Sequence, residues 1–260
     1  MPADTRMLVD PSGALLDSAR DCEAEVFLRW FGNTREQLDD EYGPYEDSSV
    51  FIAIADAQDR VVAAVRMLAP GGHAGLKTLV DVAQEPWGVD GAQAAAAVGI
   101  DLSSTWEIAT LGVRPGATNH SAHLALALYH GLILVCQANR MTSFVAILDE
   151  RVRRLLSSVG ILTRALPGVS TAPYLGSAAS TPVYAHCTPL LENQRRHFPD
   201  AYRLVTLGVG LDGVAVPPID AFRVVRTPAG VAQRADTCAT VGLVELVDGD
   251  HRSPELAGRL

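Results

Sequence analysis

The nine residues TWEIATLGV at positions 105–113 constrain the fold more than any other part of the sequence. Side chains in a β-strand point alternately to opposite faces, so this stretch presents two faces. Both are almost wholly apolar, one carrying Glu107, Ala109, Leu111 and Val113 and the other Trp106, Ile108 and Thr110. A strand that is apolar on both faces is typical of the interior of a sheet that helices cover on both sides.

Glu107 is the charged exception in this strand. Burial of a carboxylate raises its pKa, which suits the group to accept a proton near neutral pH, so one interpretation is a catalytic base. A second interpretation is a structural ion pair with Arg66, which stands among apolar residues on the predicted strand 60–68. A third is a position at the end of a strand, open to solvent. The pattern alone leaves all three open.

Apolar spacing and turn residues place the other elements. Helices are predicted over 17–31, about 119–138, 150–160 and from 189 onward, and strands over 50–56, 60–68, 143–149, twice within 161–187, and over 203–210 and 221–227. Segment 33–49 is acidic and rich in turn residues, 69–81 is predicted to be a loop that ends in a helical turn, and 91–99 is either a helix or a linker. This order predicts an α/β fold with a mixed central sheet flanked by helices on both faces. We expect residues 1–190 to form this domain, and residues 191–260 to form a C-terminal extension packed on it with a frayed tail.

Charge and composition narrow the function classes. The net charge of −9 argues against a general affinity for nucleic acid. No apolar run is long enough to span a membrane, and the first residues lack the pattern of a secretion signal, so we expect a cytoplasmic protein. The four cysteines have no metal-like spacing, which favours free thiols and predicts no metal site. We also expect no permanently bound cofactor.

Several features in order resemble the acyl-homoserine-lactone synthase branch of the GNAT acyltransferase superfamily, which is similar in turn to enzymes that make long-chain N-acyl amino acids. The resemblance runs from about residue 20 to 191. It is carried by the helix that holds Phe27, the acidic segment DDEYGPYE, the hairpin that ends in VRMLAP, and the WEIAT strand before a long helix. It implies a GNAT-like fold and transfer of an acyl group from a thioester to an amine.

The resemblance also implies a site. In those synthases a strand arginine and a glutamate on the following major strand belong to an ionic cluster in the acceptor cleft, and Arg66 and Glu107 match those positions. Glu107 would take the proton from the attacking amine, directly or through water. The acceptor cleft would be shaped by Asp40, Glu41, Trp106 and Thr110, and the acyl donor would contact Leu111, Val113, Asn119 and Ser121.

The sequence departs from the synthases at two positions of this cluster. Thr110 stands where they carry an arginine three residues after the glutamate, and Glu23 stands where they carry an arginine one turn before the helix phenylalanine. These departures leave the amine acceptor open, because the enzymes that make long-chain N-acyl amino acids fit the sequence about as well as the acyl-homoserine-lactone synthases.

The segment ATNHSAHLALA after the 105–113 strand bears on the acyl donor. Acetyltransferases of the superfamily hold the pyrophosphate of CoA in a glycine-rich turn at this helix start, but here Ser121 and His123 stand where the two loop glycines are expected. This favours a long-chain acyl group on acyl-CoA or on the phosphopantetheine of acyl carrier protein, although divergence with CoA still bound is an alternative. Arginines of RVRR (151–154), with Arg195 and Arg196, are the candidate docking patch for an acidic carrier protein.

We therefore predict an N-acyltransferase that moves a fatty acyl group from a thioester to a small amine. An acetyl-CoA-dependent N-acetyltransferase is an alternative within the same class. The alternative from another class is a non-catalytic module on a GNAT scaffold that binds an acyl ligand or a partner.

Overall fold

A mixed sheet forms the centre of the computed structural model, which describes residues 5–116 and 121–225. In these residues the strands run in the order β6-β8-β5-β4-β3-β2-β1-β9, and β7 also pairs with β8. The strands are β1 (Thr5–Val9), β2 (Ser49–Asp56), β3 (Val61–Leu68), β4 (Thr105–Val113), β5 (Ser143–Asp149), β6 (Arg164–Ala165), β7 (Ala172–Tyr174), β8 (Ser177–His186) and β9 (Val214–Ala215). The pairs β4–β5 and β1–β9 are parallel and the others antiparallel, so the predicted mixed sheet is confirmed.

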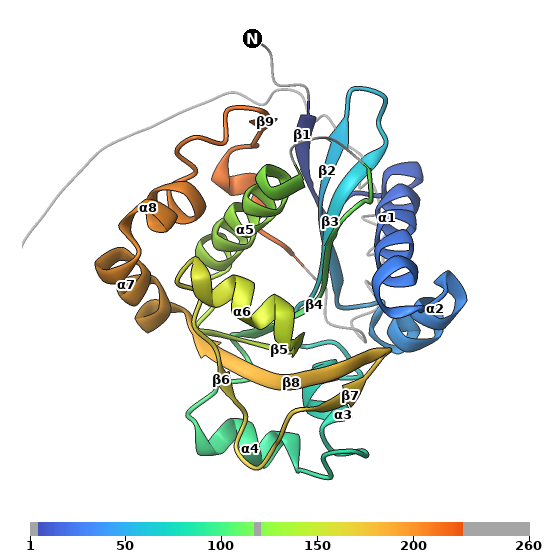
Figure 1. The fold of residues 1–260 in the computed structure, drawn as a ribbon, viewed down its shortest axis with the longest axis vertical. Coiled ribbons are helices and arrows are strands. Elements are labelled where there is room, and N and C mark those ends of the chain that lie inside the picture. Colours follow the sequence, from blue (N-terminus) through green and yellow to red (C-terminus); the bar gives the residue numbers. More distant parts are fainter. Residues whose placement is uncertain (1–4, 117–120, 226–260) are drawn as a thin grey trace, which may run out of the picture. The chain divides into compact units, whose positions relative to one another are not determined.

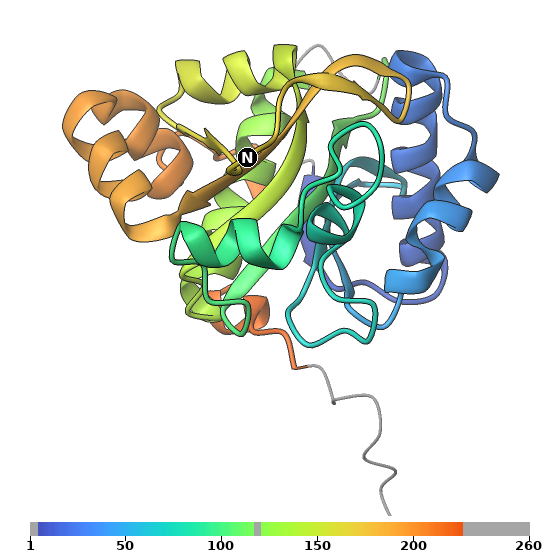
Figure 2. The ribbon, with the colours of Figure 1, turned by 90° about the horizontal axis from the view of Figure 1, so that it is seen from below.

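Helices cover both faces of this sheet (Figures 1 and 2). The helices are α1 (Ala14–Phe31), α2 (Arg35–Tyr42), α3 (Lys77–Asp81), α4 (Gly91–Ala97), α5 (Ser121–Ala138), α6 (Glu150–Ser158), α7 (Cys187–His197) and α8 (Pro199–Ala201), with shorter helical turns η1 (Gly43–Tyr45), η2 (Tyr202–Thr206) and η3 (Ile219–Phe222). Helices α1 to α4 lie on one face and α5 to α7 on the other, so the predicted cover of helices on both faces is confirmed.

Helix α1 packs so closely on β4 that only glycine fits at one contact. A Cβ atom on Gly112 would lie 2.5 Å from Cγ1 of Val26, well inside contact distance. On the opposite face α5 is buried because it is apolar on most sides, and its Leu124, Ala127 and Leu128 belong to the main core with β2 and β3.

A β-bulge at Ala109 changes which side chains of β4 share a face. Arg66 of β3 pairs with Thr110 and Met67 pairs with Ile108, so Ala109 is the extra residue. Glu107, Ala109 and Thr110 consequently face α1, α2 and α3, whereas Trp106, Ile108, Leu111 and Val113 face α5. Strict alternation, which grouped Glu107 with Leu111 and Val113 and grouped Trp106 with Thr110, was therefore wrong beyond the bulge.

Three other predictions need correction. Segment 35–42 is a helix, because Thr34 and Gln37 form a reciprocal capping box that outweighs the turn-rich composition. The late strands predicted over 203–210 and 221–227 are wrong, since η2 is a π-helical turn and η3 a 3₁₀ turn. Strand β1 was not predicted. Part of the predicted strand 221–227, its residues 226 and 227, lies outside the described residues.

The described part of the C-terminal extension completes the core on the α5 face. Val205, Leu211 and Phe222 are buried in the same apolar cluster as α5, and His130 Nδ1 lies 2.9 Å from the carbonyl oxygen of Val205. The boundary at residue 190 stays a prediction, and the predicted frayed tail lies outside the described residues.

Candidate active site

The sheet opens between β4 and β5. The two strands pair only from Thr105 to Glu107, opposite Ser143 to Val145. Beyond that point β4 stays paired to β3 and β5 stays paired to β8, but they no longer pair with each other. In Figure 1, β5 and β8 run across the lower part of the view while β2 and β3 stand upright, which shows how strongly the sheet turns here. The opening leaves backbone groups of both strands free to bind an extended ligand.

A large apolar cavity, cavity 1, lies on the α5 face of this opening. Its empty space, part of which is open to solvent, is about 820 Å³. Its wall is built by β4, β5, α5, α6 and α7, and includes Leu111, Ile133, Phe144, Ala146, Leu156 and Leu190. Among the described residues no charged side chain lines it. Cavity 1 can therefore hold a hydrocarbon chain without burying an unpaired polar group.

A second cavity, cavity 2, lies on the α1 face of the same opening. Its empty space is about 620 Å³, also partly open to solvent. Its wall includes the aromatic residues Phe27, Phe31, Tyr42 and Tyr174, the hydroxyl-bearing residues Thr110, Ser177 and Ser180, and the acidic residue Asp149. Ile108, Leu111, Leu148 and Val152 line both cavities. The two cavities therefore meet at the opening between β4 and β5.

Glu107 is buried on the α3 side of β4, with 3% of its surface exposed. Its Oε2 atom accepts a hydrogen bond of 2.8 Å from the backbone N–H of Thr78, at the start of α3. Burial raises the pKa of Glu107 from 4.5 to about 7, and the Asp81 carboxylate adds to the rise, although hydrogen bonding from Thr78 and the charge of Lys77 oppose it. The carboxylate does not line either cavity, but Ile108 and Ala109, the next two residues of β4, line cavity 2.

A buried charge cluster surrounds Lys77, the only lysine of the chain. Its Nζ atom lies 2.7 Å from Glu41 Oε2 and 2.7 Å from Asp81 Oδ2. It also lies 5.7 to 5.9 Å from the ring centres of Tyr42, Tyr45 and Tyr174. Burial alone would lower the pKa of Lys77, but the hydrogen bonds to Asp81 and Glu41 outweigh it and raise the pKa, so the ammonium stays charged.

Tyrosines separate this cluster from cavity 2. The hydroxyl of Tyr174 donates a hydrogen bond to Asp81, and the hydroxyl of Tyr42 lies 3.5 Å from the carbonyl oxygen of Ala109. Burial raises the pKa of both phenols above the ordinary value, and nearby carboxylates, including Glu107, reinforce the effect. Both side chains therefore stay protonated, and each is a hydrogen-bonding group between the cavity and the buried charges.

Arg66 is held by Glu23, not by Glu107. Its Nε and Nη2 atoms donate bonds of 3.0 and 2.6 Å to the two oxygens of Glu23, and its guanidinium carbon lies 4.5 Å from the ring centre of Tyr42 and 4.7 Å from that of Phe51. The hydroxyl of Thr110 also donates to Glu23. The proposed structural pair of Arg66 with Glu107 is therefore wrong, because Glu23 on α1 occupies the guanidinium.

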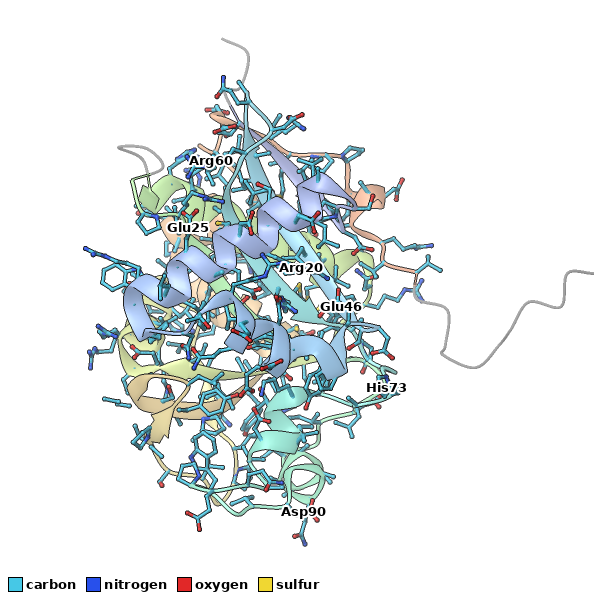
Figure 3. All side chains as sticks on the ribbon, turned by 90° about the vertical axis from the view of Figure 1, so that its right-hand side faces the viewer. Arg20, Glu25, Glu46, Arg60, His73 and Asp90 are labelled. Carbon is cyan, nitrogen blue, oxygen red and sulfur yellow. The ribbon has the colours of Figure 1, made fainter. Side chains whose placement is uncertain are left out.

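A more exposed carboxylate, that of Glu46, lies beside the buried pair of Arg66 and Glu23. Nη1 of Arg66 lies 3.8 Å from Oε2 of Glu46, and Arg20 of α1 pairs with the same carboxylate. Figure 3 shows Arg20 and Glu46 near each other beside α1. The two residues that depart from the synthase pattern, Glu23 and Thr110, thus contact each other and share one partner, Arg66. Both therefore belong to one hydrogen-bonded group around Arg66.

The remaining candidates fall into different places. Thr110 and Leu111 line cavity 2, and Leu111 also lines cavity 1. Trp106 and Val113 pack in the core on the α5 face and line neither cavity. Asp40 is exposed on α2 and Glu41 binds Lys77. Asn119 lies outside the described residues, as does the side chain of Ser121.

Sequence reasoning missed Lys77, Tyr42 and Tyr174, and it did not give Glu23 a role. The signal for Lys77 was its uniqueness, since every other basic residue apart from histidine is arginine. No sequence signal links Tyr174 on β7 to Asp81 on α3, because the two are 93 residues apart and meet only through the fold.

The described residues contain neither a candidate metal site nor a candidate membrane-spanning helix. No group of three or more His, Cys, Asp or Glu side chains there is arranged to hold a metal ion. No helix in the same residues combines the length and apolarity that crossing a membrane requires.

Comparisons with known proteins place the fold. No protein-family model matches the sequence, and no curated protein is similar to it in sequence. Among solved structures, FeeM, an N-acyl amino acid synthase from uncultured soil microbes, has a TM-score of 0.54 and 10% identity over 74% of this chain and 95% of FeeM. BjaI is a CoA-dependent acyl-homoserine lactone synthase with two similar solved structures. The structure of BjaI that contains MTA has a TM-score of 0.54 and 16% identity over 84% of this chain and 97% of BjaI. The structure of BjaI that contains SAM and isopentyl-CoA has a TM-score of 0.50 and 17% identity over 85% of this chain and 97% of BjaI.

These likenesses confirm the predicted resemblance at the level of the fold. The shared architecture includes a mixed sheet with helices on both faces, and it extends over almost the whole length of both solved proteins. The chain therefore has the fold of the GNAT acyltransferase superfamily, in the form shared by the acyl-homoserine-lactone and N-acyl amino acid synthases.

Proposed function

We propose that this protein is an N-acyltransferase that moves a fatty acyl group from a thioester to a small amine. The observation that carries the proposal is cavity 1, an apolar space of about 820 Å³ beside the opening between β4 and β5. The fold supports it, because the solved proteins of this fold named above are synthases that join acyl groups to small molecules.

The two cavities divide the substrates. The acyl chain lies in cavity 1, the thioester lies at the opening beside Ile108 and Leu111, and the amine enters from cavity 2. The amine nitrogen attacks the thioester carbonyl, so that a C–N bond forms and the C–S bond breaks. The proton lost by the amine is finally taken by the departing thiolate, which leaves as a thiol.

Glu107 is the proposed base for the first proton transfer. Its pKa of about 7 suits it to take a proton near neutral pH. Because the carboxylate stands behind the wall of cavity 2, the proton passes through one water or through the hydroxyl of Tyr42. Arg66 in this proposal is a positioning residue, since its bonds to Glu23 hold α1 against β3 and β4.

The donor is proposed to be a long-chain acyl-CoA or an acyl carrier protein. The rim of cavity 1 supports the carrier protein as partner, because α6 and α7 both line the cavity and carry the exposed Arg151 and Arg196. Contacts of the donor with Asn119 and Ser121 are predicted from the sequence and belong to this proposal.

A donor series tests this function. Thiol release is measured with acyl-CoA and with acyl carrier protein that carry acetyl or long acyl groups. We expect kcat/KM to be about tenfold or more higher for the long acyl donors than for the acetyl donors, because each buried methylene contributes about 0.8 kcal/mol. Ala146→Phe, which fills cavity 1 at a fully buried position, is expected to shift the preference to shorter chains. Ala92→Phe on the exposed face of α4 is the matched control and leaves the preference unchanged. Acetyl-CoA as the best donor would contradict the proposal.

One observation favours a second candidate, a non-catalytic module that binds an acyl ligand. Glu107 lines neither cavity and Arg66 is already occupied by Glu23. In that case long-chain thioesters bind with the same dependence on cavity 1, but no thiol is released with any amine. Binding and thiol release measured on the same sample separate the two candidates.

A further inference from the structure

The polar groups of cavity 2 point to the class of amine that it accepts. A hydroxyl has one hydrogen to donate and two lone pairs that accept. Three hydroxyls of the cavity wall give their hydrogen to a carboxylate: Thr110 to Glu23, Tyr174 to Asp81, and Ser177 to Asp149 at 2.7 Å. What they still offer to a ligand are lone pairs. A ligand rich in N–H donors matches this wall.

The charged side chains around cavity 2 also favour a ligand that carries N–H donors, because they are mostly negative. Asp149 is the only charged side chain among the described residues of its wall. Burial works to raise the pKa of Asp149, but hydrogen bonds from Arg151 and Ser177 outweigh it and keep the pKa below the ordinary value, so the group is an anion. Its ion-pair partner Arg151, 3.1 Å away, is 63% exposed, so water screens that cation more than it screens the less exposed carboxylate. Behind the wall Asp81 and Glu41 together outnumber the single cation Lys77. The cavity therefore favours a positive ligand.

A carboxylate on the ligand would find no matching cation among the described residues of the wall. Arg66 is 2% exposed, lines neither cavity, and donates hydrogen bonds from Nε and Nη2 to Glu23. Lys77 lies behind Tyr42 and Tyr174 and is held by two carboxylates. Desolvation of a substrate carboxylate against lone pairs and Asp149 would be unfavourable.

The aromatic side chains add attraction for a cation. Phe27 and Phe31 line cavity 2 with their ring centres 5.4 Å apart, and Tyr42 and Tyr174 line it from α2 and β7. Ring faces attract ammonium groups by the cation–π interaction. Aliphatic segments between two amino groups also pack well against such rings.

We propose that cavity 2 accepts an aliphatic diamine, an amine with a second cationic group and no carboxylate. The inference rests on the proposed function and names its acceptor class. Asp149 and the aromatic rings hold the distal ammonium, while the other amine, neutral when it attacks, forms the C–N bond to the acyl carbon. The C–S bond breaks and the released proton ends on the thiol.

The test compares 1,5-diaminopentane with lysine, which differs from it only by a carboxylate. Titration calorimetry of the full chain with each ligand measures binding without any turnover. We expect the diamine to bind about tenfold or more tightly than lysine, because lysine must bury its carboxylate beside Asp149 and the lone pairs of the cavity wall. Asp149→Asn, in which asparagine can still cap α6, is expected to remove most of this preference.

Asp90→Asn is the matched control. Asp90 caps α4 in the same way, by accepting a hydrogen bond of 2.9 Å from Gln93, but it lies away from cavity 2, at the lower end of the view in Figure 3. The Asp90→Asn variant should prefer the diamine over lysine by the same factor as the wild-type protein. Acyl transfer to each ligand is then measured by mass spectrometry.

Each outcome decides one proposal or the other. Lysine bound as tightly as the diamine, or no measurable binding of the diamine, overturns the inference. Diamine binding without acyl transfer from any thioester supports the inference about cavity 2 and removes the proposed function. Transfer to lysine in preference to the diamine keeps the proposed function and overturns the inference.

Discussion

Glu23 and Glu107 lie on the same side of the sheet and are buried to nearly the same degree, yet their surroundings differ. Glu23 accepts two hydrogen bonds from the guanidinium of Arg66 and a third from Thr110. Glu107 accepts one hydrogen bond from a backbone N–H and has no guanidinium partner among the described residues. Its pKa rises to about 7 in consequence of burial.

One fold therefore contains two kinds of buried carboxylate, one that stabilises the structure and one that is suited to proton transfer. A buried carboxylate that accepts hydrogen bonds from a guanidinium binds its helix to the sheet. A buried carboxylate with a single neutral donor can gain or lose a proton near neutral pH at small cost. By this comparison Glu23 stabilises the fold and Glu107 is the proposed base.

The largest effect is expected at Glu23. Glu23→Gln leaves the buried Arg66 with only the more distant Glu46, 3.8 Å away, as a charged partner, and breaking a buried pair in this way lowers the free energy of unfolding by about 3–5 kcal/mol. Denaturant unfolding at neutral pH measures the loss. Glu192→Gln, which removes an exposed i,i+4 partner of Arg196 on α7, is the control and should lower it by about 0.5 kcal/mol or less. Equal stability of the two variants would show that the Arg66–Glu23 pair does not hold α1 on the sheet.

The next effect is expected on turnover at Glu107. Glu107→Gln keeps an oxygen for the N–H of Thr78 but cannot take up a proton, so kcat should fall at least about 100-fold, equal to about 2.7 kcal/mol. Only the deprotonated carboxylate acts as a base, so the ratio of wild-type to variant kcat should rise as the pH increases through about 7 and then level off. Stopped-time assays of thiol release across this range measure the ratio. A ratio near one at every pH would remove Glu107 from the mechanism.

Much of this fold could be predicted from the sequence because its main elements have strong local signals. Strands β2, β3, β4 and β5 are continuous apolar runs bounded by turn residues, and α5 is a long apolar helix between two of them. The late turns η2 and η3 carry strand-like composition, but packing against α5 decides their form. Such tertiary effects are not visible in a local window.

The site was predicted less completely than the fold. Burial of Glu107 follows from the apolar pattern around it and is confirmed. The partner of Arg66 could not be found, because Glu23 is on a helix 43 residues earlier and its position depends on how α1 crosses the sheet. The bulge at Ala109 carries no sequence signal of its own and reverses the faces of every later residue of β4.

The most direct test is a titration of the Glu107 carboxyl itself. Carbon-13 NMR of the full chain, labelled at the glutamate side-chain carboxyl, follows each glutamate through its protonation, and Glu107→Gln identifies the resonance by its loss. We expect a midpoint near pH 7 for Glu107. A midpoint near the ordinary value of 4.5 would show that this carboxylate is already ionised well below neutral pH, and would contradict its distinction from Glu23.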